Sequence, residues 1–92
     1  MGYSITAKNK YNEESAYYHY PSQEKDKPLH KVLNINVKDQ NRIEKPYSLG
    51  QLLEAKSKLM NITGSLGEQD FIDAAILAMK ETNVKSILII FN

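Results

Sequence analysis

The sequence lacks cysteine entirely. Without thiols the chain can form neither a disulfide scaffold nor a thiolate zinc site, and a cysteine nucleophile is excluded as well. Arginine is nearly absent too, because Arg42 is the sole arginine among twelve basic residues. Lysine does not have the planar fork with which arginine reads guanine edges and phosphates through paired hydrogen bonds. The composition therefore disfavours sequence-specific nucleic-acid recognition.

Excess charge and long apolar runs are also missing. The formal net charge is +1, from twelve basic and eleven acidic residues, whereas a general phosphate-backbone binder carries a basic excess. No apolar run approaches the roughly 18 residues that a membrane span requires, and the first residues contain no apolar signal segment. We therefore expect a cytoplasmic protein without a membrane partner.

What remains is the composition of an ordinary globular protein. Of the 92 residues, 41% are hydrophobic and 25% are charged, which argues against wholesale disorder. A chain of this length has room for one hydrophobic core. The sequence predicts a single domain over residues 1–92.

The C-terminal stretch is the clearest structural signal. Ile87–Phe91 is apolar at every position and contains three isoleucines, as expected for a buried strand. Gly67–Asn83 reads as an amphipathic helix with acidic residues near its start, which suits the helix dipole. Because the strand is more apolar than a two-layer sheet needs, either the tyrosine-rich segment covers its second face or a partner does.

The N-terminal third combines one clear strand with a polar segment. Tyr3–Ala7 alternates apolar and polar residues and predicts a half-buried strand. Residues 9–29 are predicted to form a polar, tyrosine-bearing loop or insert. Within it, the alternation in Ala16–Tyr20 permits a short strand paired with the first one, and a helical turn beginning near Asn12 is the alternative.

Alternation returns from His30 to Lys38, which we interpret as a strand with Leu33, Ile35 and Val37 on its buried face. Asp39–Pro46 is predicted to be a loop, since proline normally stops a strand from continuing.

Two capping signals predict two helices. Ser48 precedes Gln51, and Ser65 precedes Glu68, with the spacing of a capping box in which each side chain bonds the other residue's amide. The first helix is expected to bury one stripe and to end near Asn61, before a left-handed turn at Gly64. That stripe comprises Leu52, Leu53, Lys56, Leu59 and Met60.

Together these elements predict an α+β fold of two layers. A small mixed sheet of three to four strands carries two helices on one face, in the order β-(β)-β-α-α-β. A right-handed crossover would make the last strand parallel to its partner.

No catalytic or metal-binding motif stands out. His19 and His30 are the only histidines, and their spacing from each other and from carboxylates matches no ligand pattern. We expect no metal and no cofactor. A small metal-free enzyme that uses His19 or His30 for proton transfer is an alternative to a non-enzymatic protein.

The tyrosines suggest a recognition surface. Four of the six lie between residues 11 and 20, and tyrosine is enriched in binding sites because it offers a large rigid ring with a polar tip. The alternative is that these rings have a structural role and cover one face of the sheet. The predicted partner-binding set is Tyr11, Glu13, Glu14, Tyr17, Tyr18, His19, Tyr20, Glu24 and Asp26.

These observations favour a non-enzymatic, protein-binding module, either monomeric or homodimeric. Its most concrete form is a small inhibitor of the toxin-immunity or phage-antagonist type that occludes a partner protein. An amphipathic helix, a tight turn and a terminal apolar strand, as in residues 67–91, look like the end of barstar-type immunity proteins, which block a toxin's active site. The resemblance covers about the last quarter of the chain and implies an inhibitory function.

A DNA-binding dimer is the specific alternative. His30–Lys38 could form the ribbon of a ribbon–helix–helix module, and Asp70–Ile76 is similar to the second helix of that family. Against this, Asp39–Tyr47 is long for the connecting loop, and Asp73 stands where the family usually has a basic residue.

Overall fold

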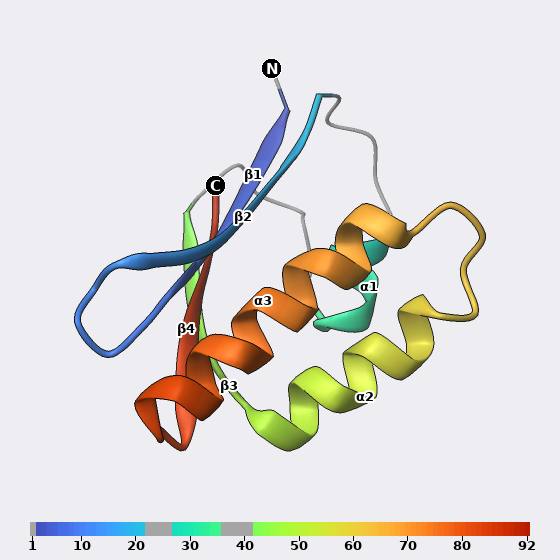
Figure 1. The fold of residues 1–92 in the computed structure, drawn as a ribbon. Coiled ribbons are helices and arrows are strands. Elements are labelled where there is room, and N and C mark those ends of the chain that lie inside the picture. The colour runs from blue at the N-terminus through green and yellow to red at the C-terminus, as the bar shows by residue number, and fades with distance from the viewer. Residues whose placement is uncertain (1, 22–26, 36–41) are drawn as a thin grey trace.

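The protein consists of one sheet covered on one face by helices (Figure 1). The computed structural model describes residues 2–21, 27–35 and 42–92. The elements are β1 (Tyr3–Lys8), β2 (Glu14–Tyr20), α1 (Pro28–Val32), β3 (Ile43–Ser48), α2 (Leu49–Leu59), α3 (Leu66–Thr82) and β4 (Ser86–Phe91). The predicted α+β class is confirmed.

The sheet has the order β2-β1-β4-β3, and each of its three strand pairs is antiparallel. The expectation of a mixed sheet with a parallel last strand was therefore wrong. Two helices join β3 to β4: α2 leads away from the end of β3, and α3 returns to the same end of the sheet (Figure 1). Because the chain re-enters the sheet where it left, β4 runs antiparallel to β3.

The expected strand from His30 to Lys38 was wrong over its described part. Pro28–Val32 is a short helix, α1, and Asn34 follows with a left-handed φ of 57°. Pro28 at the first helical position favours a helix start. Leu29, Val32 and Leu33 then recur at helical spacing and are buried. Residues 36–38 lie outside the described part of the chain.

The expected loop over Asp39–Pro46 was wrong from Ile43 onward, because β3 (Ile43–Ser48) runs through Pro46 and pairs with β4. Residues 39–41 lie outside the described part of the chain. The hydrogen-bonding pattern explains the exception. In β4, Asn92 exchanges both backbone bonds with Ser4 of β1, so alternate residues of β4, including Leu88, point their backbone groups toward β1. Pro46 pairs with Leu88 and therefore directs its nitrogen to the free edge of β3, where proline costs no ladder bond.

The first capping box is confirmed. The Ser48 hydroxyl accepts from the Gln51 amide at 3.2 Å, and the Gln51 side chain accepts from the Ser48 amide at 2.8 Å. The second is absent, since the Ser65 hydroxyl instead lies 2.5 Å from the Leu59 carbonyl and closes the end of α2. Ser65 thus caps the helix before it, and Glu68 remains available for another contact.

The buried stripe of α2 differs from the expected one. Leu52, Ala55 and Leu59 are buried, whereas Leu53 and Met60 are exposed. Lysine at position 56 fits beside the stripe because its ammonium group pairs with Asp73 of α3. The turn at Gly64 is confirmed by a φ of 80°.

The core is one cluster built from every helix and strand. β1 and β4, the central strands, contribute Ile5, Ala7, Ile87, Ile89 and Phe91. We call the side of the sheet away from the helices the outer face.

Candidate functional site

The β1–β2 hairpin places the tyrosine-rich segment in the sheet rather than over it. The Asn9 side chain accepts from the amides of Tyr11 and Glu13 and organises the turn. The prediction that Ala16–Tyr20 pairs with the first strand is confirmed, because Tyr18 opposes Ile5 and Tyr20 opposes Tyr3. The segment therefore lies beside β1 as an edge strand of the sheet.

The strand sends its aromatic side chains to both faces. Ala16 and Tyr20 are buried on the helix side. Tyr17 and His19 project from the outer face, where they oppose Thr6 and Ser4, and the Tyr17 side chain is 54% exposed. The alternation expected from the sequence is present.

Tyr20 belongs to the core rather than to a contact surface, with only 5% of it exposed. Its hydroxyl donates to Oε2 of the buried Glu68 at 3.0 Å and accepts from the Leu29 amide at 3.2 Å. Burial, opposed by the Leu29 hydrogen bond and reinforced by Glu68, raises the pKa of this phenol well above its usual range. Tyr20 therefore ties β2 to α1 and α3.

Tyr18 is intermediate in exposure and packs on the start of α3. Its ring lies edge-on to Tyr20, with the centroids 4.9 Å apart. It also lies so close to Gly67 that a β-carbon there would be 2.9 Å from Tyr18 Cε1. Burial, with a smaller contribution from Glu68, raises the pKa of Tyr18. Its ring helps to hold β2 against α3.

The other predicted contact residues separate into two groups. Tyr11, Glu13 and Glu14 are exposed on the hairpin that carries Tyr17 and His19. Glu24 and Asp26 lie outside the described residues.

Within residues 2–21, 27–35 and 42–92, the backbone of β2 has a free edge. Since Ser4 bonds to Asn92 of β4, alternation along β1 directs Tyr3, Ile5 and Ala7 toward β2. Their partners are Tyr20, Tyr18 and Ala16. The amide and carbonyl groups of Tyr17 and His19 consequently point away from the sheet.

The opposite edge, on β3, is protected in a way that β2 is not. The residues of β3 that point outward include Pro46, which has no amide, and Ser48, whose amide bonds to the Gln51 side chain. Charged residues and proline are devices that block edge-to-edge pairing, and Glu44 also faces this edge. β2 contains no proline, and its one acidic residue, Glu14, stands at its first position, away from Tyr17 and His19.

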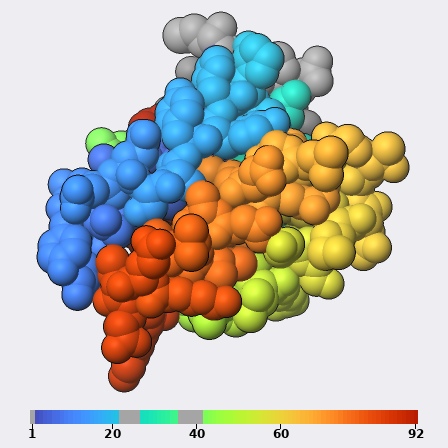
Figure 2. All heavy atoms as spheres, in the orientation of Figure 1, coloured from blue at the N-terminus to red at the C-terminus, as the bar shows by residue number. Residues whose placement is uncertain are grey.

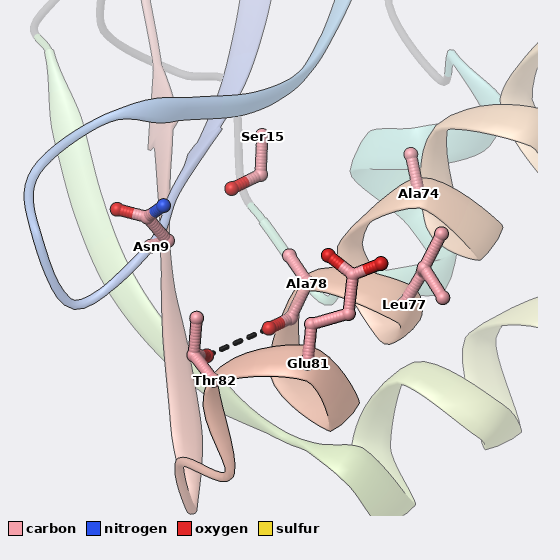
Figure 3. Close-up of a pocket in the computed structure, with 7 residues that line it drawn as sticks. All are labelled: Asn9, Ser15, Ala74, Leu77, Ala78, Glu81 and Thr82. Carbon is pink, nitrogen blue, oxygen red and sulfur yellow. Dashed lines mark hydrogen bonds between the residues drawn. The ribbon is translucent and has the colours of Figure 1, made fainter.

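A groove of about 210 Å³ runs beside the free edge, between the β1–β2 hairpin and α3. Figure 3 shows Ser15 of β2 facing Ala74, Leu77, Ala78 and Glu81 of α3 across it. Figure 2 shows that hairpin and helix both reach this surface of the molecule. Leu77 is 56% exposed, so with Ala74 and Ala78 it gives the groove an apolar wall that is open to solvent. The remaining lining residues are polar: Asn9, Ser15, Glu81 and Thr82.

The sequence did not reveal this groove. Leu77 lies outside the buried stripe of α3, whose apolar members are Phe71, Ile72, Ala75, Ile76 and Met79, and this position is a signal of exposure. However, only the fold shows that Leu77 faces Ser15.

The two histidines lie on opposite sides of the sheet. His30 is 3% exposed, with its ring centroid 4.9 Å from that of Tyr3 and 5.7 Å from that of Phe91. Its Nδ1 atom has no hydrogen-bond partner among the residues that the structure describes. Burial, and secondarily Lys27, lowers the pKa of His30. His19 lies on the outer face, so the two rings do not form a joint acid–base pair.

Within the described ranges, no three histidine, aspartate or glutamate side chains gather closely enough to hold a metal ion. None of the helices in that part of the chain is both long and apolar enough to cross a membrane. His30–Lys38 was expected to form the ribbon of a DNA-binding dimer. The first residues of this segment belong instead to the helix α1, which ends at Val32.

Comparison of the chain with protein-family models, with curated proteins and with solved structures found no match. The resemblance of the C-terminal elements to barstar-type immunity proteins is thus a likeness of element order alone.

Proposed function

We propose that this protein is a non-enzymatic binding module that attaches to another protein through β2 and the groove beside it. The observation that carries this proposal is the coincidence of an unprotected strand edge, an exposed tyrosine and an open groove with an apolar wall. Strand edges with unpaired backbone groups readily pair with another chain. Exposed apolar patches mark interaction sites.

The side chains of this surface divide into anchors and rim. Tyr11, Tyr17 and His19 are the exposed aromatic groups and serve as anchors, since aromatic residues dominate binding energy in interfaces. Glu13 and Glu14 form a charged rim. Tyr18 and Tyr20, which pack toward α3 and α1, act by positioning the strand.

In its most concrete form the protein is a small inhibitor, of the toxin-immunity or phage-antagonist kind, that covers the active surface of its target. A chain of 92 residues with a formal net charge of +1 suits such occlusion better than catalysis or wrapping of a nucleic acid.

The test is affinity capture from lysate of the native host, with nuclease added, using three versions of the protein. The wild type and Leu53→Ala, a control with a 50% exposed apolar residue on α2, should retain one stoichiometric protein partner. Tyr17→Ala should reduce its affinity by about tenfold or more, which corresponds to about 1.4 kcal/mol.

If the wild type captures no protein partner, the proposal is contradicted. Equal loss of the partner with Tyr17→Ala and with Leu53→Ala would contradict it as well. Co-purification of nucleic acid alone, in the absence of nuclease, would favour the DNA-binding alternative.

A further inference from the structure

We propose that the partner contributes an extended segment that pairs with the free edge of β2 as a fifth strand and carries a basic residue opposite Glu81. This inference rests on the proposed protein-binding function and specifies how the partner is recognised. Addition of an extended peptide to an exposed edge is a recurring mode in which backbone bonds supply affinity and side-chain pockets supply specificity.

The hydrogen-bonding groups of β2 define the register. Tyr17 and His19 each present one amide donor and one carbonyl acceptor along the free edge. An antiparallel pair exchanges both bonds at every second residue. A partner segment of about five residues therefore satisfies all four groups.

The groove determines the side chains of that segment. An added strand projects alternate side chains toward α3 and toward the outer face. Those directed toward α3 enter the groove over Ala74, Leu77 and Ala78 (Figure 3). Because these groups are apolar and the groove is about 210 Å³, the matching residue is aliphatic.

Charge distinguishes a foreign segment from a second copy of this chain. Among the described residues that line the groove, Glu81 is the only ionisable one; the exposed Glu14, which precedes Ser15, lies opposite Lys8 in the hairpin. A lysine or arginine on the added strand would pair with Glu81. A second copy of β2 offers no lysine or arginine for that pair, because the only basic residue in Glu14–Tyr20 is His19, whose side chain lies on the outer face.

The experiment selects binders from a yeast-displayed library of random ten-residue peptides, using the whole protein as bait. Enriched peptides are synthesised, and their affinities are measured by fluorescence anisotropy. Three changes are compared with the wild type: Glu81→Lys, Leu77→Ser, and replacement of Tyr17 by its α-hydroxy analogue. The last change converts one amide to an ester and removes the outward donor while the phenol side chain is kept. Leu53→Ser is the control on α2.

The expected peptides alternate apolar and polar residues and contain a lysine or arginine at a fixed position. Glu81→Lys should weaken binding at least tenfold, and exchanging the peptide's basic residue for glutamate should restore it. The ester and Leu77→Ser should each weaken binding several-fold, whereas Leu53→Ser should leave it unchanged.

The inference is overturned if no peptide is enriched, or if the enriched peptides are insensitive to the ester and to Glu81→Lys. It is also overturned if sedimentation shows that the protein alone pairs through β2 into a dimer. A lysate partner that depends on the Tyr17 side chain but not on the Tyr17 amide would refute strand addition alone and leave the proposed function standing. Absence of any lysate partner would refute the proposed function itself.

Discussion

Tyr20→Phe removes one oxygen atom from the polar contact that joins three elements. In the wild type the Tyr20 hydroxyl donates to Glu68 of α3 and accepts from the Leu29 amide at the start of α1. Phenylalanine preserves the ring, so apolar packing is unchanged. Leu29 is fully buried and Glu68 is nearly so, and neither group can replace the lost partner with bulk water.

The size of the effect follows from these two contacts. A buried donor left without an acceptor, as the Leu29 amide would be, costs about 1–3 kcal/mol. A hydrogen bond to a charged group, such as the one to Glu68, is worth about 1.5–3 kcal/mol. Because the Tyr18 hydroxyl also reaches Glu68, the carboxylate keeps part of its solvation. We therefore expect the free energy of unfolding to fall by about 2.5–3 kcal/mol, at the lower end of the combined range. For a domain of this size, each kcal/mol lowers Tm by roughly 4–8 °C.

The assay is equilibrium urea denaturation followed by far-ultraviolet circular dichroism and by tyrosine fluorescence, since the chain has no tryptophan. The midpoint should fall with no change in the denaturant slope. Tyr17→Phe is the matched control, because its hydroxyl is on an exposed side chain, and it should change stability by less than about 0.5 kcal/mol. A Tyr20→Phe variant as stable as Tyr17→Phe would refute the proposed role of this hydroxyl.

Four further substitutions test other parts of the structure. Burial lowers the pKa of His30. The contribution of His30 to stability should therefore be full above about pH 6.5 and fall as the pH drops toward the folded-state pKa. His30→Gln should remove that decline in denaturation curves, and an unchanged pH profile in this variant would refute the role of His30. Gly50→Ala, with no atom nearer than 3.9 Å to the new methyl group, should stabilise α2 by about 0.5–1 kcal/mol. Gly67→Ala should fail to stabilise α3, since its methyl group would meet Tyr18 at 2.9 Å, and an equal gain for both alanines in thermal unfolding would show that Tyr18 is not held there. Pro46→Ala should barely change stability, but it should increase self-association in sedimentation experiments because it exposes a new amide donor on the β3 edge. A purely monomeric variant would contradict the claim that Pro46 prevents pairing at this edge.

Local chemistry was sufficient to predict several elements. The alternation in Tyr3–Ala7, the apolar run Ile87–Phe91 and the capping box at Ser48 each contain their signal within a few neighbouring residues. The two faces of Ala16–Tyr20 were also readable, since a period of two permits no other arrangement in a strand.

Other features depended on contacts that are distant in sequence. Pro46 is tolerated because its nitrogen faces the free edge of β3, and a sequence pattern cannot show which edge will be free. The segment around Val32 and Leu33 satisfies both helical and alternating patterns, and Pro28 favours the helix because it stands at the first helical position. Likewise, Tyr20 resembles its exposed neighbour Tyr17 in sequence, and only the proximity of Glu68 and Leu29 identifies it as a buried link.

The most direct test of the account is residue-resolved amide hydrogen exchange of Tyr17 and His19, measured by NMR with and without a selected peptide. In the free protein these two amides should exchange much faster than those of Tyr18 and Tyr20, which bond to β1, and the peptide should slow both of them strongly. Equal protection of all four amides in the free protein, or unchanged exchange at Tyr17 and His19 in the complex, would contradict the claim that β2 is an open edge that binds a partner strand.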